Sequence, residues 1–319
     1  MTSGYADCIG CGNKNFDFIC NFLDGSRNFK DNLQLIKCKS CGLVFINPLP
    51  SREKLGSYVQ NQLFSEIDDG SYSPQVKKIL SIKDKGNILD IGCGRGFFLN
   101  RMKQSGWSAF GVELNNEMAA HAKEKFGLDI FCGTLQETKL PDGSFDAVNL
   151  RHVLEHLLLP YQTLIHIHRV LKQDGIIVIT VPNFEGFQRK IFGRYYLAVA
   201  GIFHISQFTP RSLRSLLERA GYRIISIDTF QEGASVWLYG ESLRYLLRDL
   251  RLYPFSDTQK QRHIAKEKTL NGVSARPLIL ELPMYLMRSI ERILFKAVGG
   301  AGASLGMGDV IVCCARKIP

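Results

Sequence analysis

Residues 87–96 (NILDIGCGRG) constrain the fold of this chain more than any other segment. Residues 87–91 form an apolar run typical of a buried parallel strand, and three alternating glycines follow it directly. We expect a helix from Phe97, so the order is strand, glycine turn and helix, which points backbone N–H groups at a ligand. A second strand, 108–114, contains Glu113, which is placed to accept from two ribose hydroxyls. The sequence therefore predicts a nucleoside-cofactor site.

The spacing of the glycines indicates which nucleoside is bound. A dinucleotide site uses the pattern G-x-G-x-x-G, in which a pyrophosphate meets the start of the helix. Here the pattern is G-x-G-x-G, and Asp90 stands just before it. A carboxylate at this position repels an anion and suits a cationic sulfonium with an amino-acid tail.

Several motifs in order resemble the class I S-adenosylmethionine-dependent methyltransferases, in their small-molecule or glycan-type branch. The matching segments are LDIGCGRG (89–96), GVEL (111–114), PDGSFDAVNLRHVLEHL (141–157), LKQDGIIVITVPN (171–183) and HISQFTPRSLRSLLERAGY (204–222). The resemblance implies an α/β fold with a Rossmann-like, seven-stranded methyltransferase sheet whose last strand, expected at 309–315, is antiparallel. It also implies S-adenosyl-L-methionine as cofactor.

The resemblance also implies the residues that contact the cofactor. Many relatives have Gly-Asp after the third strand, where the acid helps to hold the adenine amino group, but here the pair is Gly133-Thr134. Leu135 and Gln136 are then the expected adenine neighbours. The full expected set is Asp90, Gly92, Gly94, Gly96, Glu113, Leu114, Leu135, Gln136 and Asn149.

Four cysteines form two C-x-x-C knuckles, each followed by glycine: Cys8, Cys11, Cys38 and Cys41. Four thiolates at this spacing suit a closed, tetrahedral structural Zn²⁺ site, to which we assign no chemistry. Strand-like segments 16–22 and 33–36 fill the gap between the knuckles as a hairpin, and Cys20 has no partner. The alternative is that these thiols are buried without a metal. The segment from Cys38 onward also resembles the zinc-ribbon leader found on a subset of these methyltransferases.

The expected organisation follows from these anchors. We predict a zinc-ribbon module at 1–50, a connector at 51–85, a methyltransferase domain at 86–240 plus 305–319, and a helical insertion at 241–304. The first residues show no secretory pattern and no apolar run approaches membrane-spanning length, so we expect a cytoplasmic protein.

The acceptor is expected beside the carboxyl ends of the fourth and fifth strands. Methyl transfer requires alignment above all, and a histidine suits the proton transfer that a hydroxyl or unactivated carbon acceptor requires. A helical turn would place His152 and His156 on one side with Glu155 beside them, and His204 heads the segment after the fifth strand. These four residues are the catalytic candidates, although the turn could instead only pack the cofactor edge. No third ligand is spaced near the histidine pair, so a metal is not expected there.

Two further segments carry alternatives. Residues 186–203, aromatic and basic, form either a substrate lid or a solvated helix. Residues 283–298 are amphipathic and follow an apolar stretch at 277–282, so 277–298 either makes a peripheral membrane contact or packs onto the sheet or a partner.

The leading function is methyl transfer to a small molecule, a sugar or a lipid-linked biosynthetic intermediate. An RNA methyltransferase is the first alternative, because zinc ribbons and a pI of about 9.1 both occur in nucleic-acid enzymes. The lysines and arginines of residues 1–50 are partly offset by aspartates, and the segment around Asn149 lacks the Asn/Asp-Pro-Pro-aromatic motif that grips planar amino groups. Nucleic acid is therefore disfavoured as a partner. The last alternative is a scaffold that has kept the fold without the cofactor.

Overall fold

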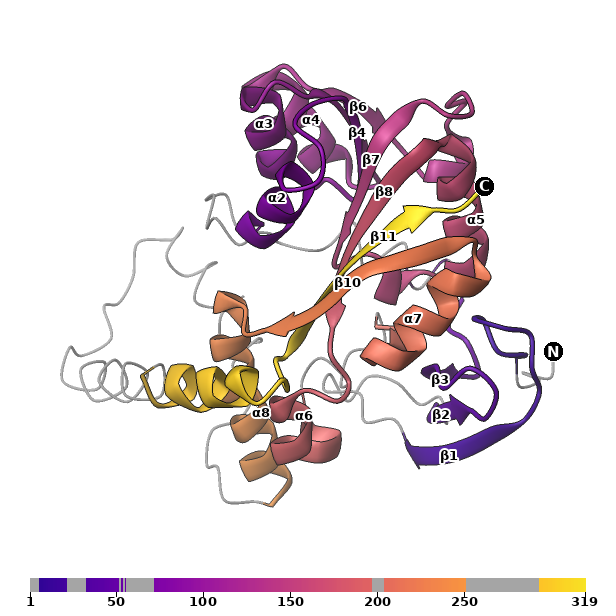
Figure 1. Cartoon of the computed structure of the whole chain (residues 1–319). Coiled ribbons are helices and arrows are strands. Elements are labelled where there is room, and N and C mark those ends of the chain that lie inside the picture. The colour runs from indigo at the N-terminus through magenta and orange to yellow at the C-terminus, as the bar shows by residue number, and fades with distance from the viewer. Residues whose placement is uncertain are drawn as a thin grey trace, which may run out of the picture.

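The computed structural model describes residues 6–21, 33–51, 53, 55, 72–196, 204–250 and 293–319 (Figure 1). Its centre is a seven-stranded sheet in the order β10-β11-β8-β7-β4-β5-β6. The strands are β4 (Asn87–Ile91), β5 (Ser108–Glu113), β6 (Asp129–Cys132), β7 (Phe145–Arg151), β8 (Leu171–Pro182), β10 (Tyr222–Phe230) and β11 (Val310–Lys317).

Five of these strands run parallel, from β4 to β8, while β11 pairs antiparallel with both β8 and β10. The predicted methyltransferase sheet with an antiparallel last strand is therefore confirmed. The strand order reverses between β4 and β7, and in sheets of this kind ligands bind outside the carboxyl ends of the strands at such a point.

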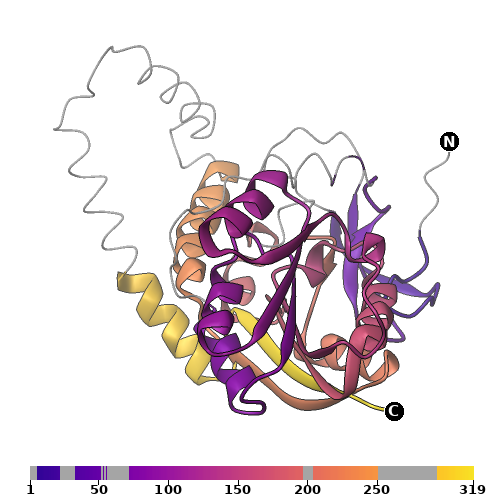
Figure 2. The same cartoon turned by 90° about the horizontal axis from the view of Figure 1, so that it is seen from above.

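Helices cover both faces of the sheet (Figure 2). Alternation along β8 divides its side chains, so that Ile176 and Val178 contact one layer and Ile177 and Ile179 contact the other. The first layer contains α2 (Ser73–Leu80), α3 (Phe97–Gln104) and α4 (Asn116–Phe126); the second contains α5 (Pro160–Val170) and α7 (Pro210–Arg219).

A second, four-stranded sheet contains the N-terminal hairpin and a strand from the large domain, in the order β1-β2-β3-β9. Its strands are β1 (Phe16–Asn21), β2 (Gln34–Cys38), β3 (Val44–Asn47) and β9 (Ser206–Gln207). The first three belong to the predicted ribbon. The fourth was not predicted, and it ties the ribbon to the segment just after His204.

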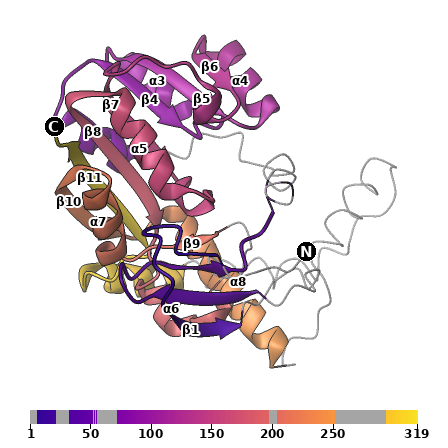
Figure 3. The ribbon, with the colours of Figure 1, turned by 90° about the vertical axis from the view of Figure 1, so that its right-hand side faces the viewer.

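The strands β2 and β3 of this small sheet are packed on both faces. Ile36 and Phe45 join the core that contains α5 and α7, while Leu35 and Ile46 pack against Phe192 and other residues of a third cluster. That cluster includes residues from α6 (Phe187–Phe192), η3 (Gly193–Tyr195) and α8 (Gly233–Asp249). Figure 3 shows the ribbon strands beside α6 and α8.

The predicted insertion is helical where it is described, but its first helix, α8, begins at Gly233, before the expected boundary. Residues 293–304 are also helical. Phe295 stacks on Tyr239 with ring centroids 5.2 Å apart, whereas Ile293 and Leu294 are exposed.

Residues 277–292 of the predicted membrane-contact segment lie outside the described residues. Within the described part of the chain, no helix is long and apolar enough to cross a membrane.

Candidate active site

The glycine turn after β4 adopts a backbone that other residues rarely adopt. Gly92, Gly94 and Gly96 have φ values of +70°, +55° and +82°. A Cβ on Gly92 would lie 2.4 Å from Cγ2 of Val153, so this glycine is required by the close approach of the chain after β7. By contrast, the nearest atom to a Cβ on Gly94 would be Sδ of Met118, at 4.0 Å, which leaves open space over the turn.

Two buried carboxylates flank this turn. Glu113 accepts hydrogen bonds from the amides of Gly94 (2.8 Å) and Asn115 (2.7 Å), so it joins the end of β5 to the glycine turn. Asp90 accepts from the side-chain amide of Asn149, also at 2.8 Å. Burial raises the pKa of Asp90 to about 7; the hydrogen bond from Asn149 opposes that rise and the Glu113 charge adds to it. Asp90 is therefore poised to ionise when a cation approaches.

The remaining expected cofactor residues differ in exposure. Leu114 is 38% exposed. Leu135 is buried in the core, and Gln136 donates to the Thr163 hydroxyl over 3.3 Å. Thr134, directly after Gly133, caps the turn η1 (Leu135–Glu137) by bonding the Glu137 carboxylate.

The candidate catalytic residues lie together, but not as a helical turn. His152 has a left-handed backbone, with φ of +53°, and Leu154–His156 form a 3-10 turn, η2. The expectation that His152 and His156 share a helical face is therefore wrong. The reversal at His152 instead directs its ring toward two carboxylates.

His152 has a carboxylate on each ring nitrogen. Nδ1 lies 3.2 Å from Oε1 of Glu155, and Nε2 lies 3.0 Å from Oε2 of Glu232. Glu232 also pairs with Arg151. Burial opposes a positive charge on His152, but the ion pairs with Glu232 and Glu155 outweigh it and raise the pKa of His152 to about 9. Glu232 was not predicted, because it follows β10 without any motif around it.

The other two histidines approach Glu155 from different segments. His156 belongs to η2, and His204 lies just before β9; their ring centroids are 4.8 Å apart. Their ring nitrogens and a Glu155 carboxylate oxygen all lie within 4.8 Å of one another. All four candidate residues are thus in one cluster at the carboxyl ends of β7 and β8.

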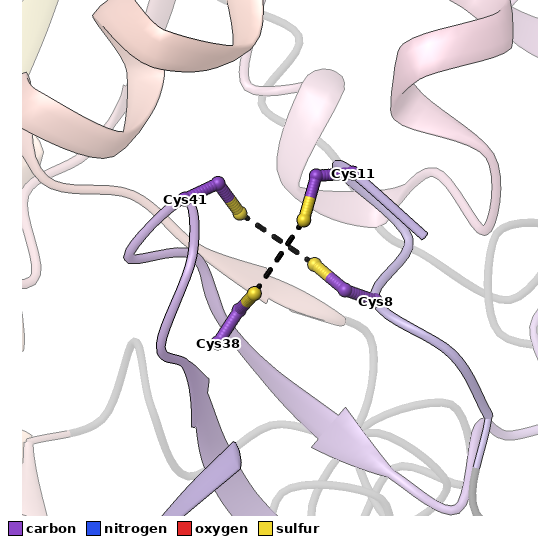
Figure 4. Close-up of side chains that lie close together, drawn as sticks. All are labelled: Cys8, Cys11, Cys38 and Cys41. Atoms are coloured by element: carbon purple, nitrogen blue, oxygen red, sulfur yellow. Dashed lines mark hydrogen bonds between the residues drawn. The ribbon is translucent and has the colours of Figure 1, made fainter. Parts of the chain in front are cut away.

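The four knuckle cysteines converge on one point (Figure 4). Sγ of Cys8 lies 3.6 Å from Sγ of Cys41, and Sγ of Cys11 lies 3.5 Å from Sγ of Cys38. Sulfurs about 2.3 Å from a tetrahedral Zn²⁺ are about 3.8 Å apart, so the donor set fits that ion. The two knuckles also match in geometry, since the amides of Gly12 and Gly42 bond the carbonyls of Cys8 and Cys38.

Comparisons with known proteins identify the family of this chain. Residues 61–227, just over half of the chain, match the family model described as a methyltransferase domain. The chain therefore belongs to the methyltransferase-domain family.

Two curated relatives illustrate the sequence similarity. A Mycolicibacterium smegmatis protein described as a probable S-adenosylmethionine-dependent methyltransferase is 29% identical over 139 residues, which are 43% of this chain and 52% of that protein. A ubiquinone biosynthesis O-methyltransferase from Roseobacter denitrificans is 30% identical over 159 residues, 48% of this chain and 59% of that protein. The chain thus spans about half the length of the curated relatives it matches.

A solved structure from Bacillus halodurans, described as a putative methyltransferase, shares the fold. It superposes with a TM-score of 0.50 over 77% of this chain and 98% of that chain, at 15% sequence identity.

Proposed function

We propose that the protein is an S-adenosylmethionine-dependent methyltransferase that acts on a small-molecule, sugar or lipid-linked biosynthetic intermediate. The observation that carries this proposal is that the Glu113 carboxylate accepts a hydrogen bond from the glycine turn at Gly94, while Asp90, just before the turn, is buried. In the cofactor-bound protein, Glu113 would hold the ribose hydroxyls, and Asp90 would favour the positive charge of the cofactor. This intact turn disfavours a scaffold that has lost its cofactor.

The acceptor would lie over the cluster at the ends of β7 and β8. His156 and His204 are half-buried there, beside fully buried Glu155. An acceptor could therefore reach the two histidines from solvent. Two relatives are described as a ubiquinone biosynthesis O-methyltransferase and as a demethylmenaquinone methyltransferase from Listeria monocytogenes, and these descriptions favour small-molecule or lipid acceptors.

Among the histidines, His152 is the least suited to remove a proton from the acceptor. Both of its ring nitrogens already contact carboxylates, so it orients Glu155 and Glu232. His156 and His204 are therefore the histidines that we expect to face the acceptor. Transfer itself would be an in-line displacement, which the protein promotes by alignment.

Two observations disfavour RNA as acceptor. The side chain of Asn149 donates to Asp90 and is 1% exposed, so it is not available to grip a planar base. In the ribbon, Lys14 and Lys39 lie 3.8 Å and 3.1 Å from the carboxylates of Asp7 and Asp17, which offset their charge.

For the ribbon itself, we propose one structural Zn²⁺ on the four cysteines.

A methyl-transfer screen tests the proposed function. Protein would be incubated with S-adenosylmethionine carrying a labelled methyl group, with separate pools of phenolic quinone precursors, sugars, polyprenyl-linked glycans and structured RNA. We expect label in one of the first three pools, and no label with Gly94→Arg, which fills the open space over the turn. Label confined to RNA would overturn the acceptor class. No label in any pool, together with no cofactor binding, would support the scaffold.

A further inference from the structure

We propose that Glu155, His156 and His204 bind one divalent first-row transition-metal ion, whose remaining coordination positions take oxygen atoms of the methyl acceptor. The role in acceptor binding rests on the proposed function. The ion site itself rests on the geometry of these three side chains and is separate from the cysteine cluster.

The fold brings the three ligands together from two segments. Glu155 and His156 are adjacent in η2, directly after β7, and His204 is 48 positions further along, before β9. An octahedral ion about 2.1 Å from each ligand atom holds those atoms about 3.0–4.2 Å apart. The observed separations are all within 4.8 Å, so the side chains would rotate inward to bind an ion.

Glu155 provides an independent indication of a ligand. Its side chain is 1% exposed, and one of its oxygens, Oε1, contacts His152. Within the described residues, the other oxygen, Oε2, is buried and has no hydrogen-bond partner. A buried carboxylate oxygen without a partner is costly, and a bound cation would remove that cost.

The surrounding residues resemble the supporting contacts of known metal sites. Ligating carboxylates in proteins are held by further hydrogen bonds that fix their orientation. Here His152 fixes Oε1 of Glu155, and Glu232 fixes the opposite nitrogen of His152. Glu155 can therefore present its free oxygen in a fixed direction.

The donor set indicates the class of ion and its use. Two imidazoles and one carboxylate suit Mn²⁺, Fe²⁺, Co²⁺ or Zn²⁺, and three protein ligands leave positions open for water or substrate. An acceptor hydroxyl at such a position loses its proton more readily, to solvent or to a neighbouring base. Its oxygen then forms the new bond to the methyl carbon as the carbon–sulfur bond breaks, and sulfur keeps the electron pair, which yields S-adenosylhomocysteine.

Mn²⁺ is the first probe, because thiolate sites favour Zn²⁺ and the four cysteines can be loaded beforehand with one equivalent of Zn²⁺, which leaves the second site open. The zinc-loaded full chain would be titrated with Mn²⁺ and free ion measured by electron paramagnetic resonance. We expect one bound Mn²⁺ per chain, displaced by Co²⁺, and at least tenfold weaker binding by His156→Asn and by His204→Asn. His166→Asn, a histidine of α5 outside the cluster, is the matched control and should bind as the wild type does.

Wild-type protein that binds neither Mn²⁺ nor Co²⁺ after zinc loading would overturn the ion site, as would variants that bind as tightly as the wild type. S-adenosylhomocysteine binding, measured on the same samples, separates this proposal from the proposed function. Binding of S-adenosylhomocysteine without Mn²⁺ contradicts only the ion, whereas Mn²⁺ binding without S-adenosylhomocysteine contradicts only the methyltransferase.

Discussion

The backbone amide of Ile46 donates a hydrogen bond to the carbonyl oxygen of Ile205 over 2.9 Å. Ile46 belongs to the ribbon strand β3, and Ile205 directly follows His204. The pairing continues from Val44 to Gln207 and from Phe45 to Ser206. The cysteine-bearing ribbon therefore holds the segment that brings His204 to Glu155 and His156.

The pairing of β3 with β9 predicts that loss of the proposed ribbon Zn²⁺ disturbs the position of His204. Cys41→Ser should remove nearly all of the single Zn²⁺, because a structural site requires all four thiolates, and it should weaken Mn²⁺ binding at Glu155, His156 and His204. Cys20→Ser changes a cysteine of the same ribbon outside the cluster and should keep both metals. Elemental analysis and the Mn²⁺ titration measure the two effects. Full zinc content in Cys41→Ser would contradict the assignment of the cysteines.

The geometry of the glycine turn predicts that alanine destabilises the fold more at Gly92 than at Gly94. Gly94→Ala should lower the free energy of unfolding by about 1–2 kcal/mol, the cost of a left-handed backbone for a residue with a Cβ. Gly92→Ala carries the same backbone cost, and its contact with Val153 should add about 1–3 kcal/mol of overpacking. Urea unfolding of both variants measures the difference. Equal losses would show that Val153 can move aside without cost.

The ion pairs of Glu232 predict a large loss of stability when its carboxylate is replaced by an amide. Glu232→Gln removes the carboxylate charge that Arg151 and His152 share, while Glu155 still faces His152, and should destabilise the fold by on the order of 3 kcal/mol, the range for breaking a buried pair. Asp228→Asn removes an exposed pair with Lys78 and should cost at most about 1 kcal/mol. Thermal unfolding compares the two variants. A Glu232→Gln protein as stable as the wild type would mean that these contacts do not persist in solution.

Asp90 predicts how cofactor binding depends on pH. Since burial raises the pKa of Asp90 to about 7, the cofactor-free protein keeps this carboxyl largely protonated below pH 7. Binding of cationic S-adenosylmethionine should then release a proton, so affinity should rise between pH 5.5 and 7, by at most about tenfold per pH unit, and level off above. Calorimetry across this range tests the trend, which Asp90→Asn should abolish. An equally steep rise in the variant would assign the proton to another group.

The raised pKa of Asp90 also has a consequence for stability. A folded-state pKa above the ordinary value of 3.8 means that the folded protein binds this proton more tightly than the unfolded chain does. The stability that the proton contributes is complete below pH 3.8 and is lost as pH rises through about 7. Relative to the wild type, Asp90→Asn should therefore gain stability in the cofactor-free state as pH rises over that interval.

Much of the fold follows from local patterns in the sequence. The run 87–91 with its glycines, and the apolar segments that became β7, β8 and β11, define a methyltransferase sheet because strand length and apolar composition are short-range signals. The histidines and Glu155 could be predicted to lie together from their places after strands, since carboxyl ends of parallel strands meet at one edge; their catalytic role stays a prediction.

The missed features depend on contacts between residues far apart in the chain. Glu232 lies 80 positions from His152, and no local pattern marks it. The two residues of β9 are too few to show strand periodicity, and their pairing with β3 depends on the folded position of the ribbon. His152 was expected in a helical turn, but ion pairs to two carboxylates favour its left-handed backbone over local helix propensity.

The most direct test of the methyltransferase assignment is a calorimetric titration of the purified, zinc-loaded chain with S-adenosylhomocysteine. We predict binding in the micromolar range, weakened at least tenfold in Glu113→Ala, because that change removes the acceptor for the ribose hydroxyls and for the amide of Gly94. Glu124→Ala, an exposed acid on α4, should bind as the wild type does. No binding by the folded wild-type chain, or equal binding by Glu113→Ala, would contradict the account.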